Sequence, residues 1–163
     1  MAAARVLLFA ATILGGFLAG GNIDRAFVAT PSWEKVGSLA WAEFSRHADL
    51  ANGLVLYPVE AIGSTVLALT AAVLFRLNTQ HPGAGALPLY AAALMSTAGL
   101  ALTILAAPIM LGIRDMADAG ALDQALRGFR FWGNLRGACQ VAAFLAMLWA
   151  LAAWPRGPNA VTH

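Results

Sequence analysis

The chain alternates between long apolar runs and short polar stretches, a pattern that predicts a bundle of membrane-spanning helices. Four runs are long enough to cross a hydrocarbon core about 30 Å thick, which takes about 20 helical residues. They cover residues of about 6–23, 53–75, 86–113 and 132–154. Spanning β-strands would instead show short segments of alternating polarity. We therefore expect an all-α integral membrane four-helix bundle, with residues 1–163 forming one domain.

The stretch between the first two apolar runs mixes charged and apolar residues at helical spacing. Pro31 suits the first turn of a helix, and Trp33 and Trp41 suit a membrane interface. We expect this stretch to form a surface helix or a helical extension that leads into the second span. The first run, in which Arg5 precedes an apolar segment, also has features of a cleavable signal peptide. We favour a retained helix, because it gives an even number of spans.

The composition agrees with a membrane protein and argues against several other classes. The 163 residues are 60% hydrophobic and 11% charged, and the mean hydropathy is +0.71. The basic residues are interleaved with acids, and no Gly-rich phosphate loop precedes a helix, so we expect no binding of nucleotides or nucleic acid. Cys139 is the single cysteine, so no intramolecular disulfide can form. We expect the lipid bilayer to be the main partner, in the inner or plasma membrane of the cell.

Charged residues are distributed unevenly between the two ends of the expected bundle. All 8 acids and most of the 10 basic residues belong to one end. The opposite end carries Arg5, Arg76 and Arg156. The positive-inside rule counts Lys and Arg, and it would place the end with more charged residues in the cytoplasm. Because several arginines of that end have the spacing of site or pairing residues, we expect cytoplasmic termini instead.

Glu60 is the most informative polar residue, because a long uncharged run precedes it in the second span. Placing a carboxylate in a membrane costs roughly 2.5 to 3.5 kcal/mol on insertion scales, so we expect it to be paired, protonated or in use. Arg136, near the start of the last span, can fork onto a carboxylate and is the expected partner. At about 100° per residue, a polar track shares the face of Glu60. Its members are Arg46, Asp49, Asn52, Tyr57 and Ser64.

The last span offers a complement to this track. Asn134 lies near its start, and Arg136 and Gln140 are four residues apart on one face. Together the two helices predict a polar pocket inside the bundle. The alternative is a set of interhelical hydrogen bonds and an ion pair that only fix helix register, each bond contributing about 0.6 kcal/mol.

Histidine and acid spacing gives little support to a metal centre. Glu43 and His47 are four residues apart, but His81 and His163 belong to the far end of the bundle. No paired Glu-x-x-His motifs occur, so a di-iron bundle is not indicated. We therefore predict no metal site and no cofactor.

These residues resemble the anthrone oxygenase-like family of small four-helix membrane proteins, most of which are domains of unknown function. The resemblance spans essentially the whole chain. It is carried by the run from Ser45 to Gly63, by Trp33 and Trp41 upstream, and by Trp132-Gly-Asn134-Leu-Arg136. It implies oxidation of a lipophilic enolisable or aromatic substrate by dioxygen without a cofactor. One group would remove a proton from an acidic carbon, and others would hold the developing enolate.

The same resemblance implies roles for individual residues. The catalytic residues are Glu60, Arg136 and His47, with Glu60 or His47 as the base and Arg136 as the partner of the oxyanion. The substrate-binding residues are Arg46, Asp49, Asn52, Tyr57, Asn134 and Gln140. The alternative is a non-enzymatic membrane component, such as a small-solute or proton pathway or an accessory subunit of a membrane complex, because no strong catalytic motif occurs. A cavity beside Glu60 is required by the first hypothesis.

Overall fold

The structure is a computed structural model that describes residues 1–78 and 83–154. The turn expected around residues 78–85 lies partly outside the described residues, and His81 and His163 lie wholly outside them. The chain runs, in order, through α1 (Ala2–Asp24), η1 (Arg25–Ala29), α2 (Thr30–Val36), α3 (Ser38–His47), η2 (Ala48–Asn52), α4 (Gly53–Asn78), α5 (Ala86–Gly112) and α6 (Ala119–Ala152). The elements η1 and η2 are single π-helical turns. The all-α prediction is confirmed.

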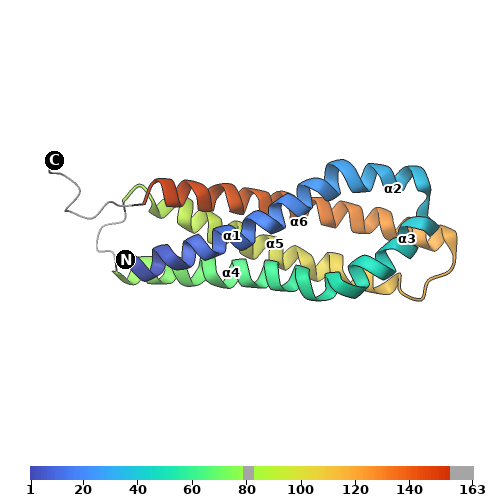
Figure 1. Ribbon diagram of the computed structural model, residues 1–163, viewed down its shortest axis with the longest axis horizontal. Coiled ribbons are helices and arrows are strands. Elements are labelled where there is room, and N and C mark those ends of the chain that lie inside the picture. Colours follow the sequence, from blue (N-terminus) through green and yellow to red (C-terminus); the bar gives the residue numbers. More distant parts are fainter. Residues whose placement is uncertain (79–82, 155–163) are drawn as a thin grey trace.

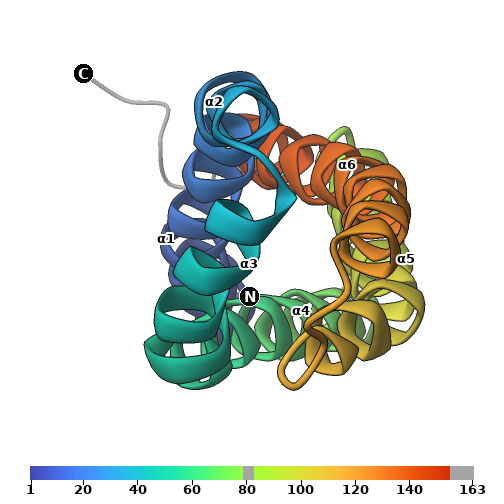
Figure 2. The ribbon, with the colours of Figure 1, turned by 90° about the vertical axis from the view of Figure 1, so that its right-hand side faces the viewer.

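Four helical stretches are long and apolar enough to cross a membrane, as predicted. They are Ala2–Val36, Ser38–Asn78, Ala86–Gly112 and Ala119–Ala152. Neighbouring stretches run antiparallel, and α1 begins at the end of the bundle where α6 finishes (Figure 1). The opposite end, called here the charged end, carries α2, α3 and the connection between α5 and α6. Seen from that end, α2 and α3 lie in front of four long helices that surround a common interior (Figure 2).

The last helix begins earlier than the prediction of residue 132, at Ala119. Its first turn is capped by Asp118, whose carboxylate accepts a hydrogen bond of 2.7 Å from the backbone N–H of Ala121. Leu122, Leu126 and Phe129 then recur at helical spacing and are all buried. The charged residues between them lower the local hydropathy, which hides this amphipathic turn from a search for apolar runs.

Gly37 separates α2 from α3. Its φ of +92° and ψ of 160° lie in a region that only glycine adopts readily. The reversal stacks Trp33 on Trp41, with ring centroids 4.8 Å apart. Trp41 is 6% exposed and belongs to a packed core, so the predicted interfacial position of this tryptophan is wrong.

Two apolar clusters fill the two ends of the bundle. Towards the termini, Leu8, Phe75 and Leu89 are completely buried between the four long helices. At the charged end, Trp41, Ile113, Leu122 and Leu126 form a second cluster between α3, α5 and α6. The stretch between the clusters is where the polar residues of the spans converge.

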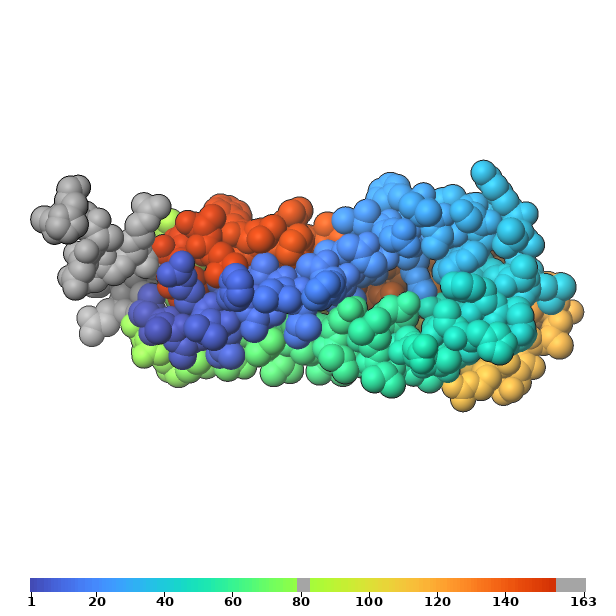
Figure 3. All heavy atoms as spheres, viewed as in Figure 1, coloured from blue at the N-terminus to red at the C-terminus, as the bar shows by residue number. Residues whose placement is uncertain are grey.

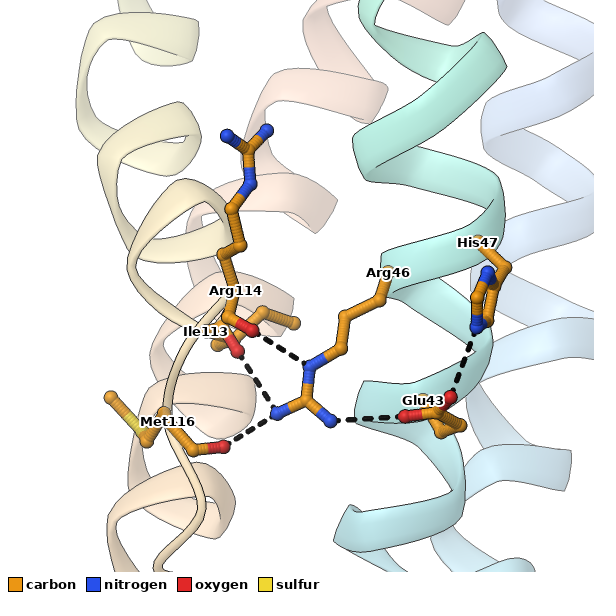
Figure 4. Close-up of polar contacts among 6 residues, drawn as sticks. All are labelled: Glu43, Arg46, His47, Ile113, Arg114 and Met116. Atoms are coloured by element: carbon orange, nitrogen blue, oxygen red, sulfur yellow. Dashed lines mark hydrogen bonds and ion pairs between the residues drawn. The ribbon is translucent and has the colours of Figure 1, made fainter.

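Arg46 ties α3 to the chain segment that follows α5 (Figure 4). Its Nε donates to the carbonyl of Arg114 at 3.0 Å, and its Nη2 donates to the carbonyls of Ile113 at 3.2 Å and Met116 at 2.5 Å. Its Nη1 donates to Glu43 Oε2 at 3.1 Å. Carbonyls at the end of a helix lack intrahelical donors, so this one guanidinium satisfies several of them. We call this contact the Arg46 clasp.

We expect an Arg46→Ala variant to lose about 2 kcal/mol of unfolding free energy, because hydrogen bonds from a charged group to several carbonyls are removed together. Unfolding in detergent, followed by circular dichroism, measures the change. The matched control is Arg127→Ala at the same end, whose ion pair with Asp123 is exposed and should contribute less than about 1 kcal/mol. Equal losses in the two variants would contradict the structural role of the clasp.

Candidate functional site

A cavity of about 480 Å³ lies between the two apolar clusters. Small-molecule sites have volumes of about 300 to 1,000 Å³, so the cavity has the size of a ligand site. The molecular surface is hollowed between α1 and α4, and atoms of α6 are visible inside the hollow (Figure 3). Most of the lining is apolar. The charged side chains that line it are Asp24, Arg25, Asp49, Glu60 and Arg136.

Arg25 and Asp49 form an ion pair in the wall of the cavity. Arg25 is the first residue of η1 and Asp49 is the second residue of η2, so the pair joins the two π-helical turns. The guanidinium carbon of Arg25 also lies 5.4 Å from the ring centroid of Trp33, 5.5 Å from that of Tyr57 and 5.7 Å from that of Phe129. A single cation therefore contacts side chains from α2, η2, α4 and α6. Each cation–π contact adds about 0.5 to 2 kcal/mol, depending on its exposure.

The π-helical turns explain why the predicted polar face is only partly present. A π turn bonds residue i to i+5 and is wider than an α turn, so it rotates all later residues relative to a regular helix. Pro58 adds a second irregularity, because it cannot donate a hydrogen bond to the carbonyl of Leu54. Of the polar track, Asp49 within η2, Tyr57 directly before Pro58 and Glu60 after it line the cavity. Single π turns are frequent at functional sites.

Arg136 projects a guanidinium with no ion-pair or hydrogen-bond partner among the described residues, and its Nε is buried. Glu60 lines the same cavity, is only partly buried, and likewise has no ion pair in the described part of the chain. The ion pair predicted between Glu60 and Arg136 is therefore not present. Asp49 is the carboxylate that the fold pairs, and Arg25 is its partner. Both Arg136 and Glu60 remain free to contact a bound molecule.

Gln140 closes the inner wall of the cavity. Its Oε1 accepts a hydrogen bond of 2.7 Å from Asn22 Nδ2, which also donates to the carbonyl of Leu18 at 2.7 Å. This contact joins α1 to α6 where the two helices are close. A Cβ atom added at Gly137 would lie 3.2 Å from Asn22 Oδ1, so glycine allows this approach.

The structure brings together five of the nine predicted site residues, namely Asp49, Tyr57, Glu60, Arg136 and Gln140. The other four lie outside the lining of the cavity. Asn52 and Asn134 are exposed, and Arg46 makes the clasp described above. The His47 side chain is 79% exposed, and its Nε2 lies 3.0 Å from Glu43 Oε1. His47 lies on the outward side of α3, away from the polar track.

Arg25 and Asn22 are site residues that the polar pattern of the sequence does not predict. They lie three residues apart at the end of the first span, so a helical projection places them on one face. Arg25 directly follows Asp24, and adjacent opposite charges near a membrane surface are ordinary. The spacing of Asn22 and Arg25 is the one signal that could have identified them.

The chemistry of the site follows from an unpaired cation and an unpaired carboxylate that line one largely apolar cavity. A guanidinium can stabilise an oxyanion, and a carboxylate can accept a proton. Among the described residues, no cluster of three or more His, Cys, Asp or Glu side chains is arranged to hold a metal ion. Comparison with known proteins identifies no relative, because no protein-family model, no curated protein and no solved structure matches the chain.

Proposed function

We propose that the protein is a membrane-embedded, oxygenase-like enzyme that acts on a lipophilic enolisable or aromatic substrate in the cavity. The observation that carries this proposal is the presence of Glu60 and Arg136, both without an ion-pair partner, in the lining of one cavity of ligand size. The resemblance of the sequence to anthrone oxygenase-like proteins supports the same reaction class. The largely apolar lining suits a substrate that partitions into the bilayer.

In the proposed reaction, the Glu60 carboxylate takes a proton from an acidic carbon of the substrate. Arg136 donates hydrogen bonds to the oxygen on which the enolate charge develops. The carbanion passes electrons to dioxygen and forms a carbon–oxygen bond, and return of the proton gives a hydroperoxide. Loss of water from the hydroperoxide leaves a carbonyl group. In sum, one CH₂ group and one O₂ become one C=O group and one water molecule.

A continuous solute or proton pathway through the bundle receives less support. The cavity occupies the half of the bundle nearer the charged end. The other half is filled by apolar side chains, of which Leu8, Phe75 and Leu89 are all 0% exposed. A pathway across the membrane would need polar groups or an opening through this packed region.

We also propose that the chain lies in the inner or plasma membrane with its termini in the cytoplasm. Several arginines at the charged end are engaged by acids, as in the pairs of Arg25 with Asp49 and of Arg130 with Glu34. These arginines have structural contacts that explain their presence at that end. A cysteine placed at Ala2 in a Cys139→Ser background should react with an impermeant maleimide only after the membrane is permeabilised. Labelling in intact cells would contradict this orientation.

The function is tested by dioxygen consumption in nanodiscs, with an anthrone as the probe substrate. We expect uptake of one O₂ for each carbonyl product, at a rate well above that of the same anthrone in empty nanodiscs. Empty nanodiscs are the necessary control, because anthrones also react slowly with dioxygen in solution. An anthrone that binds the protein but is oxidised no faster than in the control would overturn the proposal for this substrate class.

A further inference from the structure

We infer that the cavity also binds, in competition with the proposed substrate, a single-chain amphiphile with a carboxylate head, and that this amphiphile reaches the cavity from within the bilayer through an apolar opening between α4 and α5. The head would bind Arg136, and the chain would lie along the opening. This inference rests on the proposed role of the cavity as a ligand site. It does not depend on the oxidation chemistry.

The two ends of the cavity are closed along the axis of the bundle. At the charged end, Trp41 is 6% exposed, Ile113 and Leu122 are 0% exposed, and the Arg46 clasp crosses the same end. Towards the termini, the cluster around Phe75 fills the interior. A ligand therefore has no direct route from the water at either end, which leaves the sides of the bundle.

One side opening is formed by apolar residues of α4 and α5. Leu54 and Ile62 of α4 and Leu111 of α5 line the cavity and are also 44%, 49% and 47% exposed, so they lie at its mouth. Leu54 and Ile62 are eight residues apart and share one face of the helix. Three residues beyond Ile62 the two helices meet, because the Thr65 hydroxyl, which donates to the carbonyl of Ala61 at 2.7 Å, also lies 3.4 Å from the carbonyl oxygen of Ser96. This part of α4 belongs to a stretch that is long and apolar enough to cross a membrane, so the proposed route places the mouth against hydrocarbon.

The hollow between α1 and α4 has a different character (Figure 3). The residues that α1 and α4 contribute to the cavity include Asp24, Glu60 and Tyr57, which carry two carboxylates and a hydroxyl group. Carboxylates repel an approaching anion, and a hydrocarbon chain gains nothing from polar neighbours. The apolar opening between α4 and α5 is therefore the route that suits an anionic amphiphile.

Arg136 determines the chemistry of the head group. Its guanidinium offers five N–H donors, none of which has a partner among the described residues, and its Nε is buried. A planar guanidinium binds a carboxylate through two parallel hydrogen bonds. The other cation of the cavity, Arg25, is already neutralised by Asp49. One unpaired cation and a cavity of about 480 Å³ match one carboxylate and one hydrocarbon chain.

The test measures binding of radiolabelled oleate to the full chain in phosphatidylcholine nanodiscs. We expect an Ile62→Trp variant, which fills the apolar mouth, to bind oleate about tenfold more weakly or worse. Leu111→Trp is a second variant of the same mouth. The matched control is Val59→Trp, because Val59 is 57% exposed on α4 and lies outside the lining of the cavity. Thermal unfolding confirms that each variant is folded.

Further arms of the experiment identify the route and the head group. We expect Gly21→Trp, at the edge of the hollow between α1 and α4, to bind oleate as the wild type does. We expect unlabelled oleate to compete better than oleyl alcohol, butyrate or phosphatidate, and Arg136→Gln to remove the preference for oleate over oleyl alcohol. A loss of binding in Gly21→Trp but not in Ile62→Trp would overturn the route. If butyrate competed as well as oleate, the long hydrocarbon chain would not be required. If oleyl alcohol did so, the negative charge would not be required, and if phosphatidate did so, the site would not select a single-chain carboxylate.

Failure of this inference differs from failure of the proposed function. Oleate binding that depends on Ile62 and Arg136, with no oxygen consumption by any probe, would support the amphiphile site and count against the enzyme. Oleate binding that Ile62→Trp and Leu111→Trp leave unchanged, together with oxygen consumption on the anthrone probe, would overturn the route through α4 and α5 and leave the reaction intact.

Discussion

An Arg25→Met variant is expected to lose about 3 to 5 kcal/mol of unfolding free energy, because it leaves the Asp49 carboxylate buried without a cation. The Asp49 side chain is only 4% exposed, and its Oδ2 is a buried atom outside the ion pair with Arg25. The ion pair with Arg25 is the only salt bridge of this carboxylate in the described residues. Its loss would also separate the two π-helical turns that η1 and η2 form.

The double variant Arg25→Met/Asp49→Leu removes both charges. It therefore separates the free-energy cost of an unpaired buried carboxylate from the contribution of the ion pair to stability. Replacing a buried ion pair with apolar side chains is often neutral, so we expect most of the lost free energy to return. The surrounding rings of Trp33 and Phe129 suit an apolar neighbour as well as a cation. Unfolding in mixed micelles, followed by circular dichroism, measures all variants.

The matched control for this series is Asp123→Asn. Its ion pair with Arg127 has side chains that are 53% and 67% exposed, so its loss should cost less than about 1 kcal/mol. If Arg25→Met cost no more than Asp123→Asn, the pair of Arg25 and Asp49 would not hold η1 against η2. A double variant that is no more stable than Arg25→Met would show that the ion pair itself, rather than the uncompensated charge, determines stability.

The four spans could be predicted from the sequence because hydropathy is a local property. A helix of about 20 consecutive apolar residues is long enough to cross the hydrocarbon core wherever it occurs in the chain, so no knowledge of tertiary contacts is needed. The position of Trp41 could not be predicted in the same way, because it depends on tertiary contacts. An aromatic residue beside charged neighbours fits an interface equally well as a core, and the reversal at Gly37 turns it inward against Trp33. The start of α6 was missed for a related reason, since its apolar residues are separated by charged ones.

The site was predicted in part because the π-helical turns break the period on which the prediction depends. A regular helix from Arg46 to Ser64 would carry the residues of the polar track on one face, but η2 interrupts it at Ala48–Asn52. Tertiary packing determines which carboxylate pairs with an arginine. Asp49 and Glu60 are both acids on the polar track, and only the approach of η1 decides that Asp49 is paired. The sequence identifies the residue types of the site but does not specify their partners.

A Glu60→Gln variant is expected to lose about 10² to 10⁴-fold in the rate of oxygen consumption while it retains binding of the probe substrate. The amide has nearly the size of the carboxylate but cannot accept a proton from carbon. Because Glu60 has no ion pair in the described residues, its replacement should change stability little. A Glu60→Asp variant keeps a carboxylate and should retain part of the activity.

Glu34→Gln is the matched control, because Glu34 is exposed, pairs with Arg130 and lies outside the cavity. We expect it to turn over at the rate of the wild type. Full activity in Glu60→Gln would remove Glu60 as the base. His47 would not be the obvious replacement, because it is 79% exposed and points away from the cavity. Asp49 would then be the remaining buried candidate, since its Oδ2 takes no part in the ion pair with Arg25.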